Sequence, residues 1–165
     1  MAVFWVAKFR TPAFGELKLV KGIKGLERLL FQSEDISEEL KLFEEQGEVL
    51  EDNSQFDQEF LELQQYFQGK RENFSLALNP QGTVFQQKVW SELQKIPFGQ
   101  VISYKELAKR VGSPKGFRAV GGANGKNPIP IIIPCHRVIN EGGKLGGYSS
   151  GLLVKQQLLQ HEGVL

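Results

Sequence analysis

The residues with the clearest chemical potential stand together at Pro134-Cys-His-Arg-Val138, in a chain of 165 residues. Cys135 is the only cysteine, and His136, one of two histidines, follows it directly. A thiol attacks as a thiolate, and its ordinary pKa of about 8.5 leaves a few per cent ionised at neutral pH. An imidazole that accepts the thiol proton would therefore make Cys135 a nucleophile.

A direct contact between Cys135 and His136 is not guaranteed, because adjacent side chains of extended backbone point to opposite faces. A bridging water is the other route for the proton. The imidazole also needs an acceptor that fixes its tautomer. The residues alone leave open which carboxylate of the second half this is: Glu92, Glu106, Glu141 or Glu162.

The segment before Cys135 indicates that the thiol is held where a buried run ends. The residues from Ile131 to Ile133 are apolar, and Pro130 and Pro134 stiffen the backbone on either side of them. A buried cysteine is most often an ordinary core residue. The histidine and the arginine that follow it favour a reactive site over that interpretation.

The second half of the chain has the pattern of a mostly helical structure, whose helices must position this segment. Thr83 and Gln86 have the types and spacing of a capping box, and Ser103 and Glu106 repeat the pattern. Short helices joined by a turn that contains glycine and proline resemble a helix-turn-helix. The predicted helices cover residues 83–96, 104–111, 115–125 and 152–161.

The first half opens with a run rich in β-branched and aromatic residues, and residues 16–20 alternate polar and apolar. Turn residues at 11–15 and 21–25 separate these runs, which predicts an antiparallel meander. Residues 56–69 have the apolar spacing of an amphipathic helix, and the acidic segment 33–53 is expected to be part surface helix and part loop. Asn79-Pro-Gln-Gly82 breaks the chain, so we expect an α/β (α+β) fold in two small domains, 1–80 and 81–165. The predicted strands cover residues 3–9, 16–20, 26–31 and 74–78.

Composition excludes several classes of protein. Hydrophobic residues make up 41% and charged residues 24%, which is typical of a globular protein. No apolar run approaches 18 residues, so no membrane partner is expected. The lone cysteine excludes an internal disulfide and suits the reducing cytoplasm. With only two histidines it also argues against a zinc site, and we expect neither metal nor cofactor.

Charge divides at the same boundary as the predicted structure. Residues 1–80 hold 9 lysines and arginines against 15 aspartates and glutamates, whereas residues 81–165 hold 11 against 4. A basic half beside an acidic half is typical of proteins that bind a polyanion such as nucleic acid. Two solvated surfaces of unlike composition are the alternative interpretation, and charge alone leaves both open.

Pro134-Cys-His-Arg-Val138 resembles the active-site motif of the O6-alkylguanine-DNA alkyltransferases, the methylated-DNA–protein-cysteine methyltransferases. The resemblance covers residues 82–163, and residues 1–80 resemble the variable N-terminal domain of the same family more weakly. It implies a ribonuclease-H-like first domain and a winged helix-turn-helix-like second domain that binds DNA and accepts the alkyl group. The other segments in the family's order and spacing are 98–104, 118–124, 127–130, 147–149 and 158–163.

The resemblance implies repair of double-stranded DNA by direct reversal. Cys135 would irreversibly accept the alkyl group of O6-alkylguanine in a single turnover, and O4-alkylthymine is a second substrate that the resemblance allows. His136 is implied as the base, acting through a water, and Glu162 as the carboxylate that orients it. Tyr104 is implied to protonate guanine N3 and to crowd the adjacent phosphate.

The resemblance also assigns residues that bind the DNA. Arg118 would enter the base stack and fill the gap left by the flipped nucleotide. The small residues Ala119 and Gly122 would let their helix approach the minor groove closely. Asn127 would be the hinge between the helix-turn-helix and the active-site segment.

The base pocket that the resemblance implies lies around the same cysteine. The backbone carbonyls of Cys135 and Val138 would accept from the exocyclic amine of guanine. Tyr148 and Ser149 would belong to the loop over the flipped base, with Ser149 donating to O6.

Some positions depart from the family's pattern. Phe117 stands where alanine is frequent, and Ser149-Ser150 stands where many relatives are rich in glycine. Residues 1–80 contain no cysteine or histidine, so the zinc site of some relatives is not expected.

Three alternatives remain to be weighed against the transferase. The first is a non-catalytic protein that binds alkylated DNA, against which the presence of Cys135 argues. A helix-turn-helix regulator and a Cys/His hydrolase are the other two. The expected partner is double-stranded DNA containing O6-alkylguanine, bound by a monomer, with cooperative binding left open.

Overall fold

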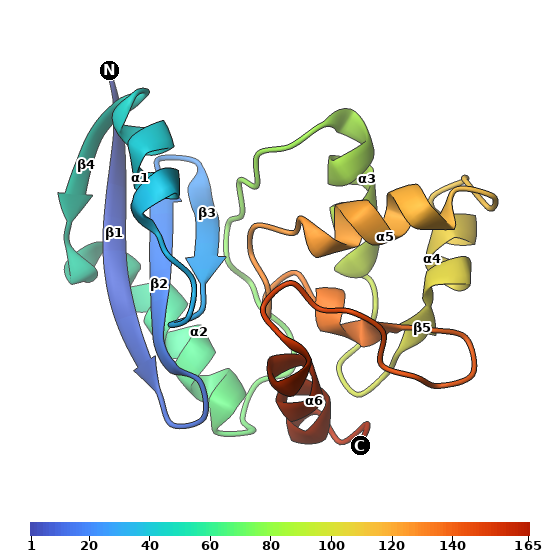
Figure 1. Cartoon of the computed structure of the whole chain (residues 1–165). Helices are drawn as coiled ribbons and strands as arrows, with labels where there is room; N and C mark the ends of the chain where they lie inside the picture. Colours follow the sequence, from blue (N-terminus) through green and yellow to red (C-terminus); the bar gives the residue numbers. More distant parts are fainter. The chain divides into compact units, whose positions relative to one another are not determined.

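The computed structural model describes all 165 residues, which form two compact units, Met1–Pro80 and Gln81–Leu165 (Figure 1). The first unit contains a four-stranded sheet with helices, and the second is mostly helical. The predicted fold class, mixed α and β structure with a helical second half, is confirmed. No helix combines the length and the hydropathy needed to cross a membrane.

Three antiparallel strands make up most of the sheet in the first unit. They are β1 (Ala2–Thr11), β2 (Gly15–Gly22) and β3 (Gly25–Leu30). Gly15 has a φ of 67°, in the left-handed region that favours glycine, and it closes the turn between β1 and β2. The predicted meander is therefore confirmed, and its alternation buries Leu17 and Leu19 completely.

The fourth strand corrects the prediction for the acidic segment. Helix α1 (Ser37–Glu44) is the expected surface helix, but β4 (Gly47–Glu51) occupies residues that were expected to be loop. β4 pairs in parallel with β1, so the sheet is mixed and has the order β3-β2-β1-β4. Because β4 lies at the edge and exposes Glu48, Leu50 and Glu51, its sequence lacks the alternation of a half-buried strand.

The helix predicted over residues 56–69 is present, but the strand predicted over residues 74–78 is not. The 3-10 helix η1 (Asn53–Phe56) leads into α2 (Asp57–Phe67). Residues 74–78 form no strand, and only Leu78 makes a bridge, with Leu26. The backbone N–H and the hydroxyl of Ser75 donate to the buried Glu62 of α2, at 2.7 and 2.6 Å. This segment is therefore tied to α2 through Ser75 and touches β3 only at its end, where the N–H of Leu26 donates to the carbonyl of Ala77.

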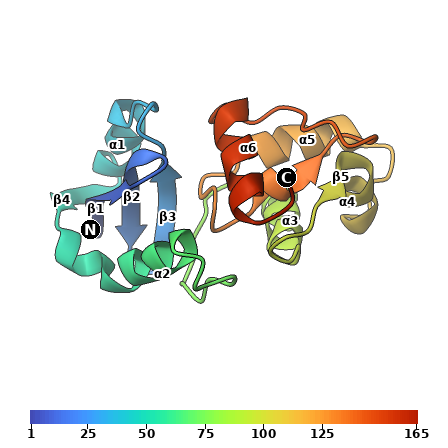
Figure 2. The same cartoon turned by 90° about the horizontal axis from the view of Figure 1, so that it is seen from below.

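The second unit is built from four helices and two very short strands (Figure 2). The helices are α3 (Val84–Leu93), α4 (Tyr104–Arg110), α5 (Phe117–Gly125) and α6 (Leu152–His161). The parallel strands are β5 (Ile102–Ser103) and β6 (Val138–Ile139), and the 3-10 helix η2 (Cys135–Arg137) precedes β6. All four predicted helices are present, with α3 ending three residues early and α5 beginning two residues late.

Of the two predicted capping boxes, one is complete. The Thr83 hydroxyl accepts from the Gln86 N–H, and the Gln86 side chain accepts from the Thr83 N–H, so the box before α3 is confirmed. Ser103 accepts from the Glu106 N–H at 3.0 Å, but the Glu106 carboxylate binds Arg110 instead of returning to Ser103. The second box is therefore only half formed, because a cation one turn along the helix competes for the carboxylate.

The apolar run that leads to the cysteine is buried, as predicted, but it is neither helix nor strand. The N–H of Ile133 donates to the carbonyl of Ile129 at 2.9 Å, which closes a turn. Ile131 has a φ of 73° and is the one residue other than glycine with a positive φ. This turn brings the chain from the end of α5 back to η2.

Candidate active site

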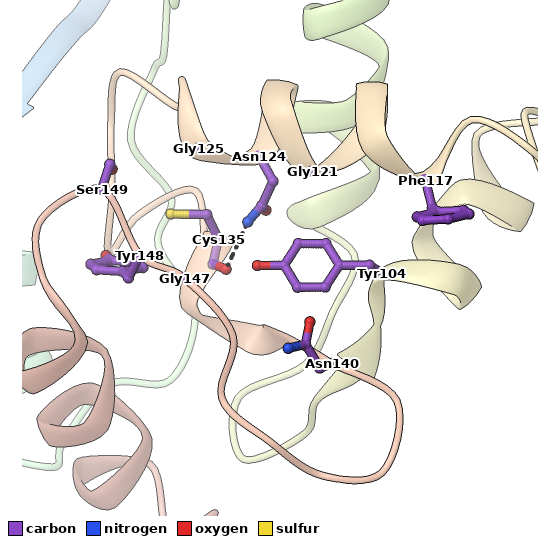
Figure 3. A pocket seen from close by; sticks show the side chains of 10 residues that line it. All are labelled: Tyr104, Phe117, Gly121, Asn124, Gly125, Cys135, Asn140, Gly147, Tyr148 and Ser149. Carbon is purple, nitrogen blue, oxygen red and sulfur yellow. Dashed lines mark hydrogen bonds between the residues drawn. The ribbon is translucent and has the colours of Figure 1, made fainter.

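The second unit contains a cavity of about 480 Å³ that reaches the cysteine (Figure 3). Its walls come from the start of α4, one face of α5, η2 and the segment between β6 and α6. The residues that line it are Tyr104, Phe117, Gly121, Asn124, Gly125, Cys135, Asn140, Gly147, Tyr148 and Ser149. Four residues predicted for the site therefore meet in one cavity, namely Tyr104, Cys135, Tyr148 and Ser149.

Cys135 is the first residue of η2 and is 3% exposed. Its N–H donates to the carbonyl of Ile133 at 2.8 Å, and its carbonyl accepts from the side-chain amide of Asn124 at 3.4 Å. Burial raises the pKa of the thiol, while hydrogen bonds from Asn127 and Tyr148 and the charge of Lys155 act in the opposite direction. The thiol is thus rigidly held, and a base is needed to remove its proton.

His136 contacts a carboxylate rather than the neighbouring thiol. Its Nε2 lies 2.8 Å from Oε2 of Glu162, and both side chains are fully buried. Burial lowers the pKa of His136, against the opposing effect of Glu162, so the imidazole is neutral and able to accept a proton. Its Nδ1 is buried without a hydrogen-bond partner. Of the four carboxylates left open by the sequence, the structure places Glu162 against His136.

Glu162 also binds a cation, Arg137, which the sequence did not indicate. Arg137 donates from Nε to Oε1 at 2.8 Å and from Nη2 to Oε2 at 2.9 Å, and its Nη1 donates to the carbonyl of Ile96 at 2.7 Å. Burial disfavours the carboxylate, but the hydrogen bonds from His136 and Arg137 outweigh it and lower the pKa of Glu162 well below its ordinary value. Glu162 is therefore a stable anion in the interior.

Tyr104, at the start of α4, presents its hydroxyl to the part of the cavity that contains Cys135 and Asn124 (Figure 3). Burial raises the pKa of Tyr104, and a thiolate at Cys135 would raise it further. The phenol consequently keeps its proton at neutral pH and can donate it. Asn124, which hydrogen bonds to Tyr104 and to the carbonyl of Cys135, has no role predicted from the sequence.

Asn127 joins α5 to the apolar turn. Its amide donates to the carbonyl of Ile133 at 2.7 Å, and its side-chain oxygen accepts from the N–H of Ile129 at 2.9 Å. Asn127 follows α5, which ends at Gly125, and both contacts hold together the turn that delivers Cys135. It does not line the cavity.

Lys155 is a buried lysine whose role no sequence pattern indicated. Its ammonium donates to the carbonyls of Val138, Leu145 and Gly147, which joins α6 to β6 and to the loop over the cavity. Burial lowers the pKa of Lys155 to about 8, while Cys135 acts in the opposite direction. The carbonyl of Val138, predicted to bind a base, thus already accepts one hydrogen bond. A lysine on a helix is usually solvated, so its sequence context carries no signal of this role.

The remaining predicted DNA contacts lie outside the cavity, on α5. Arg118, Ala119 and Gly122 are exposed, and a Cβ at Gly122 would meet no atom within 4 Å. This face of the helix is therefore open to a partner. No group of three or more histidine, cysteine, aspartate or glutamate side chains is arranged to hold a metal ion.

Comparison with known proteins covers both units. The model of the DNA-binding domain of 6-O-methylguanine DNA methyltransferase matches residues 84–164, and that of its ribonuclease-like domain matches residues 7–80. A protein of Methanosarcina barkeri named methylated-DNA–protein-cysteine methyltransferase is 45% identical over 148 residues, or 90% of each chain. A constitutive protein of that name from Bacillus subtilis is 51% identical over 104 residues, 62% of this chain and 63% of its own.

Solved structures match the whole architecture. The crystal structure of Mycobacterium tuberculosis OGT in complex with DNA has a TM-score of 0.84 and 38% identity, covering 96% of this chain and 92% of that one. The O6-methylguanine-DNA methyltransferase of Pyrococcus kodakaraensis has a TM-score of 0.71 and 29% identity, covering 98% and 99%. The fold and the buried cysteine define a methyltransferase that uses a protein thiol. The chain belongs to the O6-methylguanine DNA methyltransferase family.

Proposed function

We propose that this protein repairs alkylated double-stranded DNA by moving the alkyl group of O6-alkylguanine to Cys135. The observation that carries the proposal is the position of a buried thiol inside a cavity of about 480 Å³, beside a phenol donor. A cavity of this kind admits one base that has left the helix. The same chemistry extends the proposal to O4-alkylthymine, whose alkyl group also sits on an exocyclic oxygen.

The transfer is a single displacement. His136 takes the thiol proton through a water, and the Cys135 sulfur then attacks the alkyl carbon. A carbon–sulfur bond forms, the bond between the carbon and O6 breaks, and its electron pair stays on the guanine. Tyr104 supplies a proton to guanine N3, which yields neutral guanine, and the proton that His136 took from the thiol then restores the phenol. Glu162 holds the imidazole by the 2.8 Å contact and stabilises its protonated form.

Base flipping follows from the burial of the thiol. The alkyl carbon lies within the base stack and groove of a duplex, so a thiol that is 3% exposed reaches it only when the nucleotide leaves the helix. Flipping costs a few kcal/mol, less for a damaged and weakly paired base. Arg118, exposed on α5, is proposed to fill the vacated space, while Ala119 and Gly122 let the helix approach the minor groove.

Asn127, Val138, Tyr148 and Ser149 complete the proposed site. Tyr148 and Ser149 line the cavity, which supports their proposed contact with a flipped base. Asn127 keeps the proposed role of a hinge, supported by its contacts to Ile133 and Ile129. Val138 keeps the proposed role of acceptor because a carbonyl oxygen has two lone pairs, of which Lys155 uses one.

Double-stranded DNA is the proposed partner. The second unit carries 11 lysines and arginines against 4 acidic residues, which suits phosphate contacts that do not depend on base sequence. The M. tuberculosis relative was crystallised in complex with DNA. The cytoplasmic location and the monomeric state remain predictions.

The decisive experiment is mass spectrometry of the intact protein and its peptides after mixing with an equimolar duplex that contains one O6-methylguanine. We expect one added methyl group, located on Cys135, with guanine restored in the DNA and no second turnover. Cys135→Ala is expected to bind the duplex without reacting. If the wild-type protein binds the lesion and stays unmodified, it is a damage-binding protein and the transfer is refuted.

The flipping step has its own test. Arg118→Ala is expected to slow the reaction with the duplex more than the reaction with free O6-benzylguanine, because only the duplex requires extrusion of a base. Single-turnover rates on both substrates measure the difference. Equal losses would contradict a role of Arg118 in flipping and would leave the transfer to Cys135 intact.

A further inference from the structure

Phe117 is the first residue of α5, and its side chain is 55% exposed while lining the cavity. Single exposed apolar residues are common on protein surfaces and have no special meaning. Phe117 differs because it is an aromatic ring at the edge of the reactive cavity and next in sequence to Arg118. The proposed transfer gives it no role.

The position of the ring separates it from the reactive sulfur. Tyr104 lies between Phe117 and Cys135, so the ring stands at the end of the cavity away from the sulfur (Figure 3). An alkyl carbon under attack must touch that sulfur. Phe117 is therefore available to contact the duplex next to the lesion, which stays at the end of the cavity away from Cys135.

The charges around the ring match a nucleic acid. Lys115 and Arg118 flank Phe117 closely in sequence and are exposed, as are Lys105 and Lys109 on the neighbouring helix α4. Cations of this kind bind phosphates, whereas an aromatic ring binds the face of a base. Proteins of the minor groove commonly insert apolar side chains between base steps and thereby unstack them.

We propose that Phe117 is a second wedge beside Arg118, which stacks on the base adjacent to the extruded nucleotide. The inference rests on the proposed function, because only a duplex with an extruded base presents such a face. Arg118 then fills the gap, and Phe117 stacks on the neighbouring base. Together the two side chains offset the free energy lost when the base stack opens. An alanine at this position offers no aromatic face.

The test uses 5-iodouracil in place of the base on either side of O6-methylguanine, because light couples this base to an aromatic ring stacked on it. The complex is formed in a Cys135→Ala background, which cannot accept the methyl group. We expect a crosslink on Phe117 in one of the two duplexes, located by peptide mass spectrometry, and none in the Phe117→Ala variant. A crosslink only on Tyr104 or Tyr148 would overturn the proposal.

Affinity gives a second readout. Phe117→Ala is expected to weaken binding of the alkylated duplex about tenfold, the typical effect of losing one stacked base. Phe117→Trp should keep the affinity, and Val84→Ala is the matched control, since Val84 is also the exposed first residue of a helix but lies outside the cavity. Unchanged affinity in Phe117→Ala would overturn the wedge.

Two further outcomes distinguish the wedge from a contact with the alkyl group and from a failure of the transfer itself. If Phe117→Ala binds normally and alters only the ratio of benzyl to methyl transfer, the ring contacts the alkyl group and the wedge is refuted. Methylation of Cys135 by the same duplex, measured in the wild-type protein, tests the transfer independently. A wild-type protein that reacts, with no crosslink forming on Phe117, therefore refutes the wedge alone.

Discussion

In the interior of the second unit, one carboxylate accepts hydrogen bonds from two neighbouring side chains. Glu162 accepts from His136 and, through two hydrogen bonds, from Arg137. Removing the charge leaves the buried guanidinium without its counter-ion, which typically costs about 3–5 kcal/mol. We expect Glu162→Gln to lower the free energy of unfolding by about that amount, measured by urea denaturation.

The control for this change is the exposed pair of Glu106 and Arg110, which also lies in the second unit. Glu106→Gln removes an ion pair of the surface, where such pairs contribute at most about 1 kcal/mol. If both variants lose the same stability, the buried carboxylate has no special structural role. The transfer rate of Glu162→Gln, measured where the variant is folded, then reports on the orientation of His136 and on the stabilisation of its protonated form.

The same residue predicts how stability depends on pH. The pKa of Glu162 is lowered in the folded protein, so the unfolded chain binds the proton more readily at acid pH. The stabilisation is complete above the ordinary glutamate pKa of about 4.3 and is lost as the pH falls below it. The stability difference between wild type and Glu162→Gln that comes from this carboxyl should therefore shrink below about pH 4. A difference that persists unchanged to lower pH contradicts this assignment.

At the scale of elements, the loop between β6 and α6 depends on one lysine. The Lys155 ammonium donates to carbonyls at Val138, Leu145 and Gly147. In Lys155→Met these carbonyls lose their donor, so the loop that carries Tyr148 and Ser149 should loosen. We expect faster hydrogen exchange in residues 145–149 and a transfer rate at least about tenfold lower, since small misplacements of binding groups are costly.

Lys144→Met is the matched variant, because Lys144 lies in the same loop and is exposed. It removes the same charge without removing donors to the three carbonyls. Equal effects of the two substitutions would show that charge, rather than the attachment of the loop, is what matters.

The elements that could be predicted from sequence are those whose signals are local. The helix that follows Thr83 is marked by its own cap, and the meander by apolar strand-forming runs that end at turn residues such as Gly15. β4 escaped prediction because it gains its partner, β1, from more than 40 residues away and exposes most of its side chains. A local sequence pattern does not indicate a strand partner that lies so far away along the chain.

The same distinction holds for the site. Cys135 and His136 stand out by their types and adjacency, and the resemblance to a family supplied Glu162, which the structure places 2.8 Å from the imidazole. Arg137, Lys155 and Asn124 act through contacts with residues 8 to 41 positions away along the chain. A sequence does not show whether an arginine or a lysine is buried or solvated, so these roles could not be predicted before the structure was known.

For the whole molecule, the unequal charge of its halves predicts how binding responds to salt. Each phosphate neutralised by the protein contributes a slope of about −0.9 to the dependence of log affinity on log salt. Lys115→Ala, in the basic half, should reduce the slope by about 0.9, whereas Lys24→Ala, an exposed lysine of the acidic half, should not change it. Titrations by fluorescence anisotropy at several salt concentrations measure both slopes. A response that does not depend on salt contradicts phosphate binding by the second half.

The left-handed backbone of Ile131 has a consequence for temperature. A β-branched residue at a φ of 73° costs about 1–3 kcal/mol, and it persists only because the surrounding core enforces it. Ile129, Ile131 and Ile133 are fully buried, so this enforcement comes from packing just before the nucleophile. We expect that, on warming, the turn relaxes to an ordinary backbone conformation as soon as this packing loosens. The thiol then leaves its reactive position while the helices remain folded. Heat should therefore abolish the reaction at a lower temperature than it melts the fold.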